Sequence, residues 1–154
     1  MRAQIDESSV INANAQFWEQ MLAMHLEHLP MGQEFCVAAG HLHASVQLSG
    51  VWTGRIEVRL SDGLALSATA AMLMQPADQV AEADTLDATK EIANMIAGTI
   101  KSSLPRPCEM TVPESCVEQA CFCGPPQTED TLSVAFRHPD GDLMVRVWEQ
   151  ESKA

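Results

Sequence analysis

The stretch from residue 85 to residue 105, TLDATKEIANMIAGTIKSSLP, constrains the fold of this chain more than any other. At about 100° per residue, its pattern predicts a helix with one continuous apolar face. That face consists of Ala88, Ile92, Ala93, Met95, Ile96, Ala97 and Ile100. A face of this width indicates a helix packed on a core, with only its other side exposed to solvent.

The other side of the predicted helix is a narrow polar stripe. It contains Asp87, Glu91, Asn94, Gly98 and Lys101, which fall within roughly 80° of arc. Glycine inside a helix costs about 1 kcal/mol relative to alanine, and a merely solvated face does not need it. A glycine beside Glu91 and Asn94 lets another backbone or side chain come close. The stripe therefore predicts a surface that presents a carboxylate and an amide, one turn apart, to a partner.

The rest of the chain shows both helical and strand patterns. Helices are predicted over residues 7–28, with Ser8 or Ser9 as the N-cap, and over residues 61–75, with an acidic connector at 76–86. Asp84 or Thr85 is expected to cap the polar-stripe helix. Alternation of apolar and polar residues predicts strands at 34–38, 41–49, 51–60, 114–123, 130–138 and 142–149. This order predicts an α+β fold with helices packed on one face of a largely antiparallel sheet.

Charge and hydropathy exclude several classes of protein. The formal net charge is −12, with a pI of about 4.6, which argues against nucleic-acid binding and against docking on an anionic membrane. No apolar run approaches the roughly 20 residues that span a bilayer. The segment MRAQIDESSV lacks the apolar core of a signal peptide. We therefore expect a cytoplasmic protein.

The chain contains five cysteines, and an odd count without an export signal predicts free thiols. Cys121 and Cys123 form a C-x-C pair, and His41 and His43 form a similar pair on another predicted strand. Two such pairs would make a Cys₂His₂ metal or redox site if they met. The alternative is that each pair only shares one face of a half-buried strand. We expect no metal or other cofactor on this chain.

The string E91-I-A-N94-M-I-A-G98 resembles the ExxN helix of the CheC/CheX/FliY chemotaxis phosphatases. Asp87 upstream also matches that family, whereas Lys90 stands where the family often has a small residue, usually glycine. Residues 10–24 resemble the family's first helix, and residues 50–74 resemble its strand-then-helix segment. The likeness covers residues 8–105 well and the remaining tail loosely. We interpret residues 1–154 as one CheX-like domain with the family's two-layer sandwich.

The resemblance implies a function in two-component signalling. CheC-type members carry two ExxN helices, whereas the first predicted helix here has Asn12 but Ser9 where the glutamate would stand. A single motif indicates the CheX type, whose members pair as homodimers. Such enzymes hydrolyse the aspartyl phosphate of a CheY-like response regulator, which carries the Mg²⁺ itself. The family's roles then fall on Asn94, which positions the attacking water, and on Glu91, which docks to the regulator's lysine.

Further residues on the stripe helix are expected to contact the partner. Asp87, Lys90, Gly98 and Lys101 are assigned to docking, with Lys90 and Lys101 forming a local positive rim. Two alternatives stay open. The first is a non-catalytic scaffold of the same fold that binds a receiver domain. The second is the metal-binding or redox protein described above.

Overall fold

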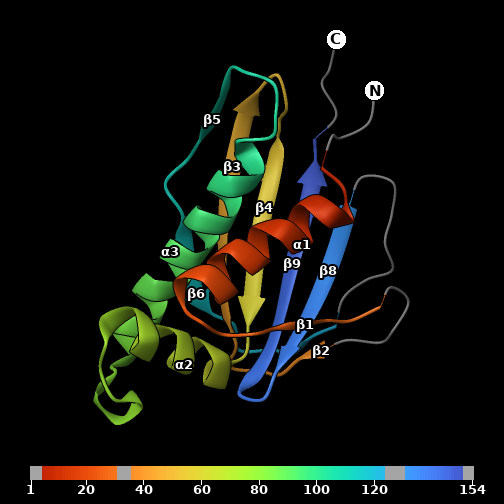
Figure 1. The fold of residues 1–154 in the computed structure, drawn as a ribbon. Coiled ribbons are helices and arrows are strands. Elements are labelled where there is room, and N and C mark those ends of the chain that lie inside the picture. Colours follow the sequence, from red (N-terminus) through yellow and green to blue (C-terminus); the bar gives the residue numbers. More distant parts are fainter. Residues whose placement is uncertain (1–4, 31–35, 124–130, 151–154) are drawn as a thin grey trace.

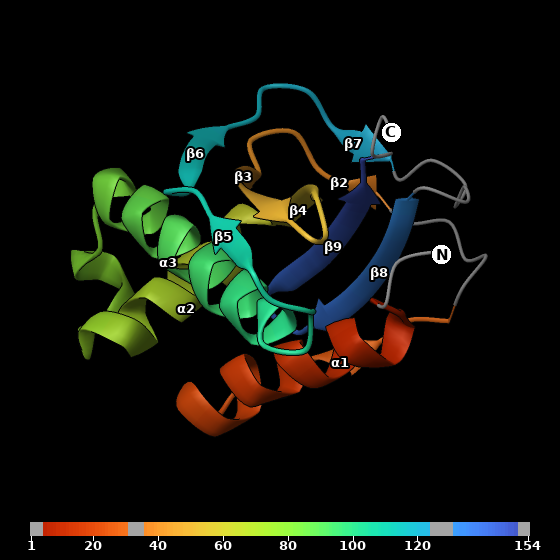
Figure 2. The ribbon, with the colours of Figure 1, turned by 90° about the horizontal axis from the view of Figure 1, so that it is seen from above.

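The computed structural model describes residues 5–30, 36–123 and 131–150. Helices α1 (Glu7–Ala15) and α3 (Glu82–Lys101) lie on one face of an antiparallel sheet (Figure 1; Figure 2). Helix α2 (Asp62–Leu73) packs against α3 and against the start of the last strand. Helices on one face of an antiparallel sheet confirm the predicted α+β class.

Within the described residues, the main sheet has seven strands in the order β1-β8-β9-β4-β3-β5, with β6 also paired to β3. All of its neighbours run antiparallel. Its strands are β1 (Glu27–His28), β3 (Leu42–Gly50), β4 (Gly54–Leu60), β5 (Cys108–Met110), β6 (Glu114–Val117), β8 (Thr131–His138) and β9 (Gly141–Glu149). A small second sheet pairs β2 (Cys36–Val37) with β7 (Phe122–Cys123) on the face away from the helices (Figure 2).

The core lies between the sheet and the helices. Ala44 and Val58 are paired across β3 and β4, Val58 is paired with Val145 of β9, and all three are fully buried. The isoleucines of the α3 apolar face, Ile92, Ile96 and Ile100, are buried against the same cluster. Full burial of such a side chain contributes about 1.5–3 kcal/mol. This packing fixes α3 rigidly and leaves its polar stripe on the outer side.

The first predicted helix is shorter than expected. Helix α1 ends at Ala15, continues as a π-helical segment at Gln16–Met21, and is followed by strand β1 rather than by more helix. The wider turn of the π-helical segment places the adjacent rings of Phe17 and Trp18 together in the core, 5.1 Å apart. The N-cap is Asp6, whose carboxylate accepts a hydrogen bond from the Ser9 backbone N–H, so the prediction of Ser8 or Ser9 was wrong.

Helix α3 also begins earlier than its predicted cap. It starts at Glu82, and the Asp84 carboxylate accepts a hydrogen bond from the Ala81 backbone N–H at 3.0 Å. Part of the expected connector is a short 3₁₀ helix at Ala77–Gln79. Strand β5 was not predicted, and the run at 114–123 divides into β6 and β7. The other predicted strands are present, with boundaries shifted by a few residues.

One expectation about cysteines was wrong. Cys108, Cys116 and Cys121 carry free thiols, as predicted, but Cys36 is disulfide-bonded. On the backbone, Cys36 lies opposite Cys123 in the β2–β7 pair. No helix in the described parts of the chain is long and apolar enough to cross a membrane.

Candidate functional site

The polar stripe of α3 faces away from the core, as its spacing predicts. Asp87 and Glu91 are exposed, and Asn94, Gly98 and Lys101 are half-buried. Two other polar side chains of this helix are used internally, since the hydroxyls of Thr85 and Thr89 donate to backbone carbonyl oxygens one turn earlier. The stripe residues instead lie on the outer side of α3, where other molecules can reach them.

Glu91 and Asn94 line a shallow groove between α3 and the segment that joins β5 to β6. The groove has a volume of ≈ 470 Å³ and is lined by Asp87, Lys90, Glu91, Asn94, Met110, Thr111, Val112 and Pro113. Val112 is 85% exposed, which is unusual for a large apolar side chain. The groove therefore combines polar side chains with one highly exposed apolar side chain at its rim.

A second hollow lies on the other side of the stripe, between α2 and α3. It has a volume of ≈ 230 Å³ and includes Leu73, which is 45% exposed. Asp87 and Glu91 belong to the linings of both hollows. The two carboxylates therefore stand on a ridge with an accessible apolar side chain on either side.

No described residue forms a hydrogen bond or an ion pair with the side chain of Glu91 or Asn94. The Asn94 amide can both donate and accept hydrogen bonds, and Glu91 can accept several. In contrast, Lys90 lies 3.7 Å from the Asp87 carboxylate. The two ExxN side chains are therefore able to form hydrogen bonds with water or with another molecule. Lys90, however, already forms an ion pair with Asp87 within the chain.

Gly98 is not required by the packing of this chain. A Cβ atom added at this position would meet nothing within 4 Å, and the backbone is that of an ordinary helix. The glycine thus has no explanation within the chain's own described contacts, which supports the prediction that it makes room for a second molecule. Gly98 and Lys101 are not among the residues that line the Asn94 groove.

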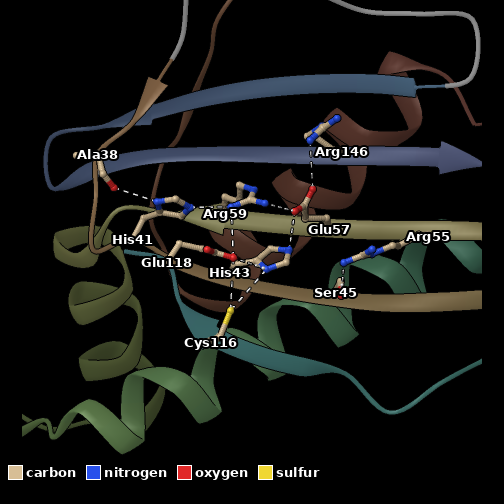
Figure 3. Close-up of polar contacts among 10 residues, drawn as sticks. All are labelled: Ala38, His41, His43, Ser45, Arg55, Glu57, Arg59, Cys116, Glu118 and Arg146. Atoms are coloured by element: carbon tan, nitrogen blue, oxygen red, sulfur yellow. Dashed lines mark hydrogen bonds and ion pairs between the residues drawn. The ribbon is translucent and has the colours of Figure 1, made fainter. Parts of the chain in front are cut away.

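A second polar cluster lies on the opposite face of the sheet, where the helices do not reach (Figure 3). Its centre is Glu57, which is 1% exposed and lies 2.8 Å from Arg59 Nη2 and 3.6 Å from Arg146 Nη1. Burial opposes ionisation of the Glu57 carboxyl, but the hydrogen bond and charge of His43 and the two guanidinium charges outweigh it. The pKa of Glu57 therefore lies below its ordinary value.

Aromatic rings cover this cluster. The Arg59 guanidinium lies 4.1 Å from the centre of the Phe122 ring, and the Arg146 guanidinium lies 4.2 Å from the Trp148 ring. Such stacking suits arginine, whose planar guanidinium is weakly hydrated. This cluster was not predicted from the sequence, because the residues of other strands reach Glu57 and Arg59 of β4 only through the pairing of β3, β4, β6 and β9.

In the alternative Cys₂His₂ metal site, His41 is not available as a ligand. His41 is buried, with Nδ1 2.9 Å from the Ala38 carbonyl oxygen and Nε2 2.9 Å from Arg59 Nη1. In the tautomer that satisfies both contacts, Nδ1–H donates and Nε2 accepts, which leaves no lone pair for a metal. Cys121 is an exposed free thiol, and the side chain of Cys123 lies outside the described part of the structure.

Comparison with known proteins places this geometry in a family. The family model "Chemotaxis phosphatase CheX" matches residues 42–137. No curated protein matches the chain.

Solved structures share the fold at low sequence identity. CheX from Vibrio vulnificus superposes with a TM-score of 0.74 at 16% identity, covering 97% of this chain and 100% of that one. CheX from Desulfovibrio desulfuricans gives 0.72 at 22% identity, covering 93% and 97%. The Borrelia burgdorferi CheX–CheY–BeF₃–Mg²⁺ complex gives 0.68 at 19% identity, covering 96% and 100%. Because the family model matches more than half of the chain, and the solved CheX structures share its fold, this chain belongs to the CheX family of chemotaxis phosphatases.

Proposed function

We propose that this protein hydrolyses the aspartyl phosphate of a CheY-like response regulator and that the α3 groove is the site where the regulator docks. Membership of the CheX family supports phosphatase activity in general. The observation that carries the proposal is the pair of unengaged side chains, Glu91 and Asn94, one turn apart on a rigidly packed helix.

Asn94 has the chemistry needed to position water. Phosphoryl transfer depends on a nucleophile in line with the scissile bond and on stabilisation of charge on the phosphoryl oxygens. The regulator supplies Mg²⁺ and a lysine, so the helper protein needs neither a base nor a metal of its own. A neutral amide that donates to and accepts from one water molecule suffices, and positioning of this kind contributes several kcal/mol.

Glu91 has the chemistry needed for docking. Its carboxylate stands on the ridge between two hollows, where it is able to pair with the regulator's lysine in a charge-assisted bond. Asp87, Gly98 and the lysine rim of Lys90 and Lys101 surround this contact. The exposed apolar side chains of Val112 and Leu73 would be covered when the regulator binds.

The proposal also places the chain in the cytoplasm with its regulator and gives it a second copy as a partner. Strand β9 offers no open edge for pairing with a second copy, because it lies between β8 and β4. Among the described residues, the outer edge of β8 is paired by β1 at Phe136 and Arg137, and the Leu29 N–H donates to the Ala135 carbonyl oxygen beside them. Light scattering that gave the mass of a monomer at micromolar concentration would contradict the homodimer.

One observation favours a second candidate, a receiver-binding scaffold without activity. Lys90 stands where the family often has a small residue, lines the Asn94 groove and lies near Asp87. A long side chain at this point changes how closely a regulator approaches Asn94. Lys90→Gly would raise the rate of phosphate loss if Lys90 obstructs the groove, and would leave it unchanged if the enzyme already docks fully.

The decisive assay follows phosphate loss from a purified CheY-like receiver that has been phosphorylated in advance. Wild-type protein should accelerate the loss, and Asn94→Ala should abolish the acceleration, because the attacking water is then no longer positioned. Asn12→Ala is the matched control, because Asn12 is an exposed asparagine on α1 without a neighbouring glutamate. If wild-type protein bound the receiver without accelerating phosphate loss, the scaffold reading would replace the enzyme reading.

A further inference from the structure

Three potential metal ligands lie together on the sheet face opposite the helices (Figure 3). His43 of β3 is directly paired with Cys116 of β6, and Glu118 lies two residues further along. Because side chains two residues apart share one face of an extended chain, all three project to the same side. One imidazole, one thiol and one carboxylate therefore meet across a strand pair.

The distances among these groups match those of a tetrahedral metal site. His43 Nδ1 lies 3.8 Å from Cys116 Sγ and 3.4 Å from Glu118 Oε1, and the sulfur lies 3.6 Å from the same carboxylate oxygen. Zinc bonds of about 2.3 Å to sulfur and about 2.0–2.2 Å to nitrogen and oxygen give edges of about 3.3–3.6 Å. An ion at the centre of this triangle needs only a small adjustment of the side chains.

Glu57 supplies the contact that commonly supports a metal-bound histidine. Its Oε1 lies 2.5 Å from His43 Nε2, on the side of the ring away from the triangle. Metal-ligating histidines usually donate the other ring N–H to a carboxylate, which fixes the tautomer and the orientation of the ring. With the proton on Nε2, the lone pair of Nδ1 points to Cys116 and Glu118.

The backbone holds the triangle before any metal arrives. The Glu118 N–H donates to the His41 carbonyl oxygen at 2.8 Å, and the Gly40 N–H donates to the Glu118 carbonyl oxygen at 2.7 Å. These bonds extend the β3–β6 pairing just beyond the end of β6. Cys116 is exposed, so a cation can reach the triangle from solvent.

We propose that His43 Nδ1, Cys116 Sγ and Glu118 Oε1 bind one divalent cation of the zinc class, with the fourth position open to water. Thiolate, imidazole and carboxylate together favour Zn²⁺ over Mg²⁺ or Ca²⁺, which prefer oxygen ligands alone. On binding, the Cys116 thiol forms a sulfur–metal bond and its proton passes to solvent.

The site would connect the two faces of the protein. Strand β6 follows the segment that carries Val112 on the rim of the α3 groove. In addition, the Ser115 hydroxyl donates to the Leu86 carbonyl oxygen of α3 at 3.0 Å. A cation held by Cys116 would therefore anchor strand β6, which directly follows the segment that forms one wall of the groove.

The competing occupant of the triangle is a proton. If His43 were an imidazolium, it would lie between the Glu57 and Glu118 carboxylates, and Arg59 Nη1, 3.8 Å from Glu118, would share the second of them. In that case the group is a set of ion pairs without affinity for metal. The two readings differ in a quantity that is directly measured, the stoichiometric binding of Zn²⁺.

The test is calorimetric titration of the purified full chain with Zn²⁺ alone. Wild-type protein should bind one Zn²⁺ per chain with a dissociation constant at or below the micromolar range. Cys116→Ser should weaken binding by about 100-fold or more, beyond the 10–100-fold typical of losing an outer contact. Glu118→Gln should also weaken it, whereas Cys121→Ser, which removes an exposed thiol outside the triangle, should leave it unchanged.

A spectroscopic readout makes the assignment specific. Co²⁺ in place of Zn²⁺ should give a thiolate-to-metal charge-transfer band that is absent in Cys116→Ser and present in Cys121→Ser. Absence of stoichiometric binding by wild-type protein would overturn the proposal in favour of the protonated cluster. Equal affinity in Cys116→Ser and wild type would also overturn it, because the cation would then lie elsewhere.

Discussion

The polar stripe of α3 and the Glu57 cluster on the opposite face of the sheet are both rich in charged side chains, but their surroundings differ. In the stripe, Glu91 and Asn94 are accessible and have no partner among the described residues. In the cluster, Glu57 is buried and contacts His43, Arg59 and Arg146. A burial cost that is offset by partners indicates a structural or ligand-holding role, whereas unengaged polar groups on a rigid element indicate recognition of another molecule.

The largest effect should come from removing the centre of the cluster. Glu57→Gln keeps the shape of the side chain but removes the buried anion beside Arg59 and Arg146, and breaking a buried pair typically costs about 3–5 kcal/mol. We expect a loss of that size in the free energy of unfolding measured with urea. Glu91→Gln on the stripe should change it by less than about 0.5 kcal/mol. If both variants lost a similar amount of unfolding free energy, the proposed difference between the buried cluster and the exposed stripe would be contradicted.

The exposed apolar rim of the stripe offers a second test. Val112→Asp should weaken binding of the regulator by about tenfold or more, because a side chain that becomes buried contributes about 1.5–3 kcal/mol. Val51→Asp is the matched control, since Val51 is 59% exposed but lies in the β3–β4 turn, outside the linings of both hollows. Equal affinities for the two variants in a binding titration would show that the regulator does not cover the groove.

Substitution of Gly98 should have opposite effects on the stability of the fold and on the binding of a second molecule. Because a Cβ at this position meets nothing in the chain, Gly98→Ala should raise the free energy of unfolding by about 0.4–1 kcal/mol. The same change should weaken regulator binding or dimer formation if a second molecule packs there. A stabilised variant with unchanged binding and unchanged oligomeric state would mean that the glycine serves no contact.

The smallest expected effect concerns the lysine rim. The double change Lys90→Glu, Lys101→Glu should slow association with the regulator by a few-fold at low salt and leave the rate at saturating regulator nearly unchanged. Exposed charges act mainly on association rate, and salt screens them over about 10 Å at 0.1 M ionic strength. Identical association rates for mutant and wild type in stopped-flow measurements at low ionic strength would show that the two lysines only contact solvent and do not take part in docking.

The sequence predicted the stripe because its information is local. Residues three or four apart on a helix share a face, so Glu91, Asn94 and Gly98 identify the surface before any fold is known. The alternation in β3, β4 and β9 likewise predicted the sheet. The π-helical break after Ala15 was missed because residues 7–28 keep an approximately helical spacing of apolar residues, including Phe17.

The cluster on the opposite face of the sheet was not predicted, because its residues lie far apart in the sequence. His43 and Cys116 are neighbours only because β3 and β6 pair in one register, and no spacing motif encodes a contact between segments so far apart. The C-x-C spacing of Cys121 and Cys123 is visible in the sequence, whereas Cys116 has no cysteine or histidine at so short a spacing. Val112 was missed as well, because a single apolar residue in a connecting segment carries no periodic signal.

The central claim is that Asn94 acts in the chemical step and Glu91 in docking. The most direct measurement is the rate of receiver dephosphorylation as a function of regulator concentration for Asn94→Ala and Glu91→Ala. We predict that Asn94→Ala lowers the rate at saturation to that of the receiver alone, with an unchanged unfolding free energy, and that Glu91→Ala mainly raises the concentration needed for half-saturation. A saturating rate in Asn94→Ala equal to that of the wild type would contradict the account.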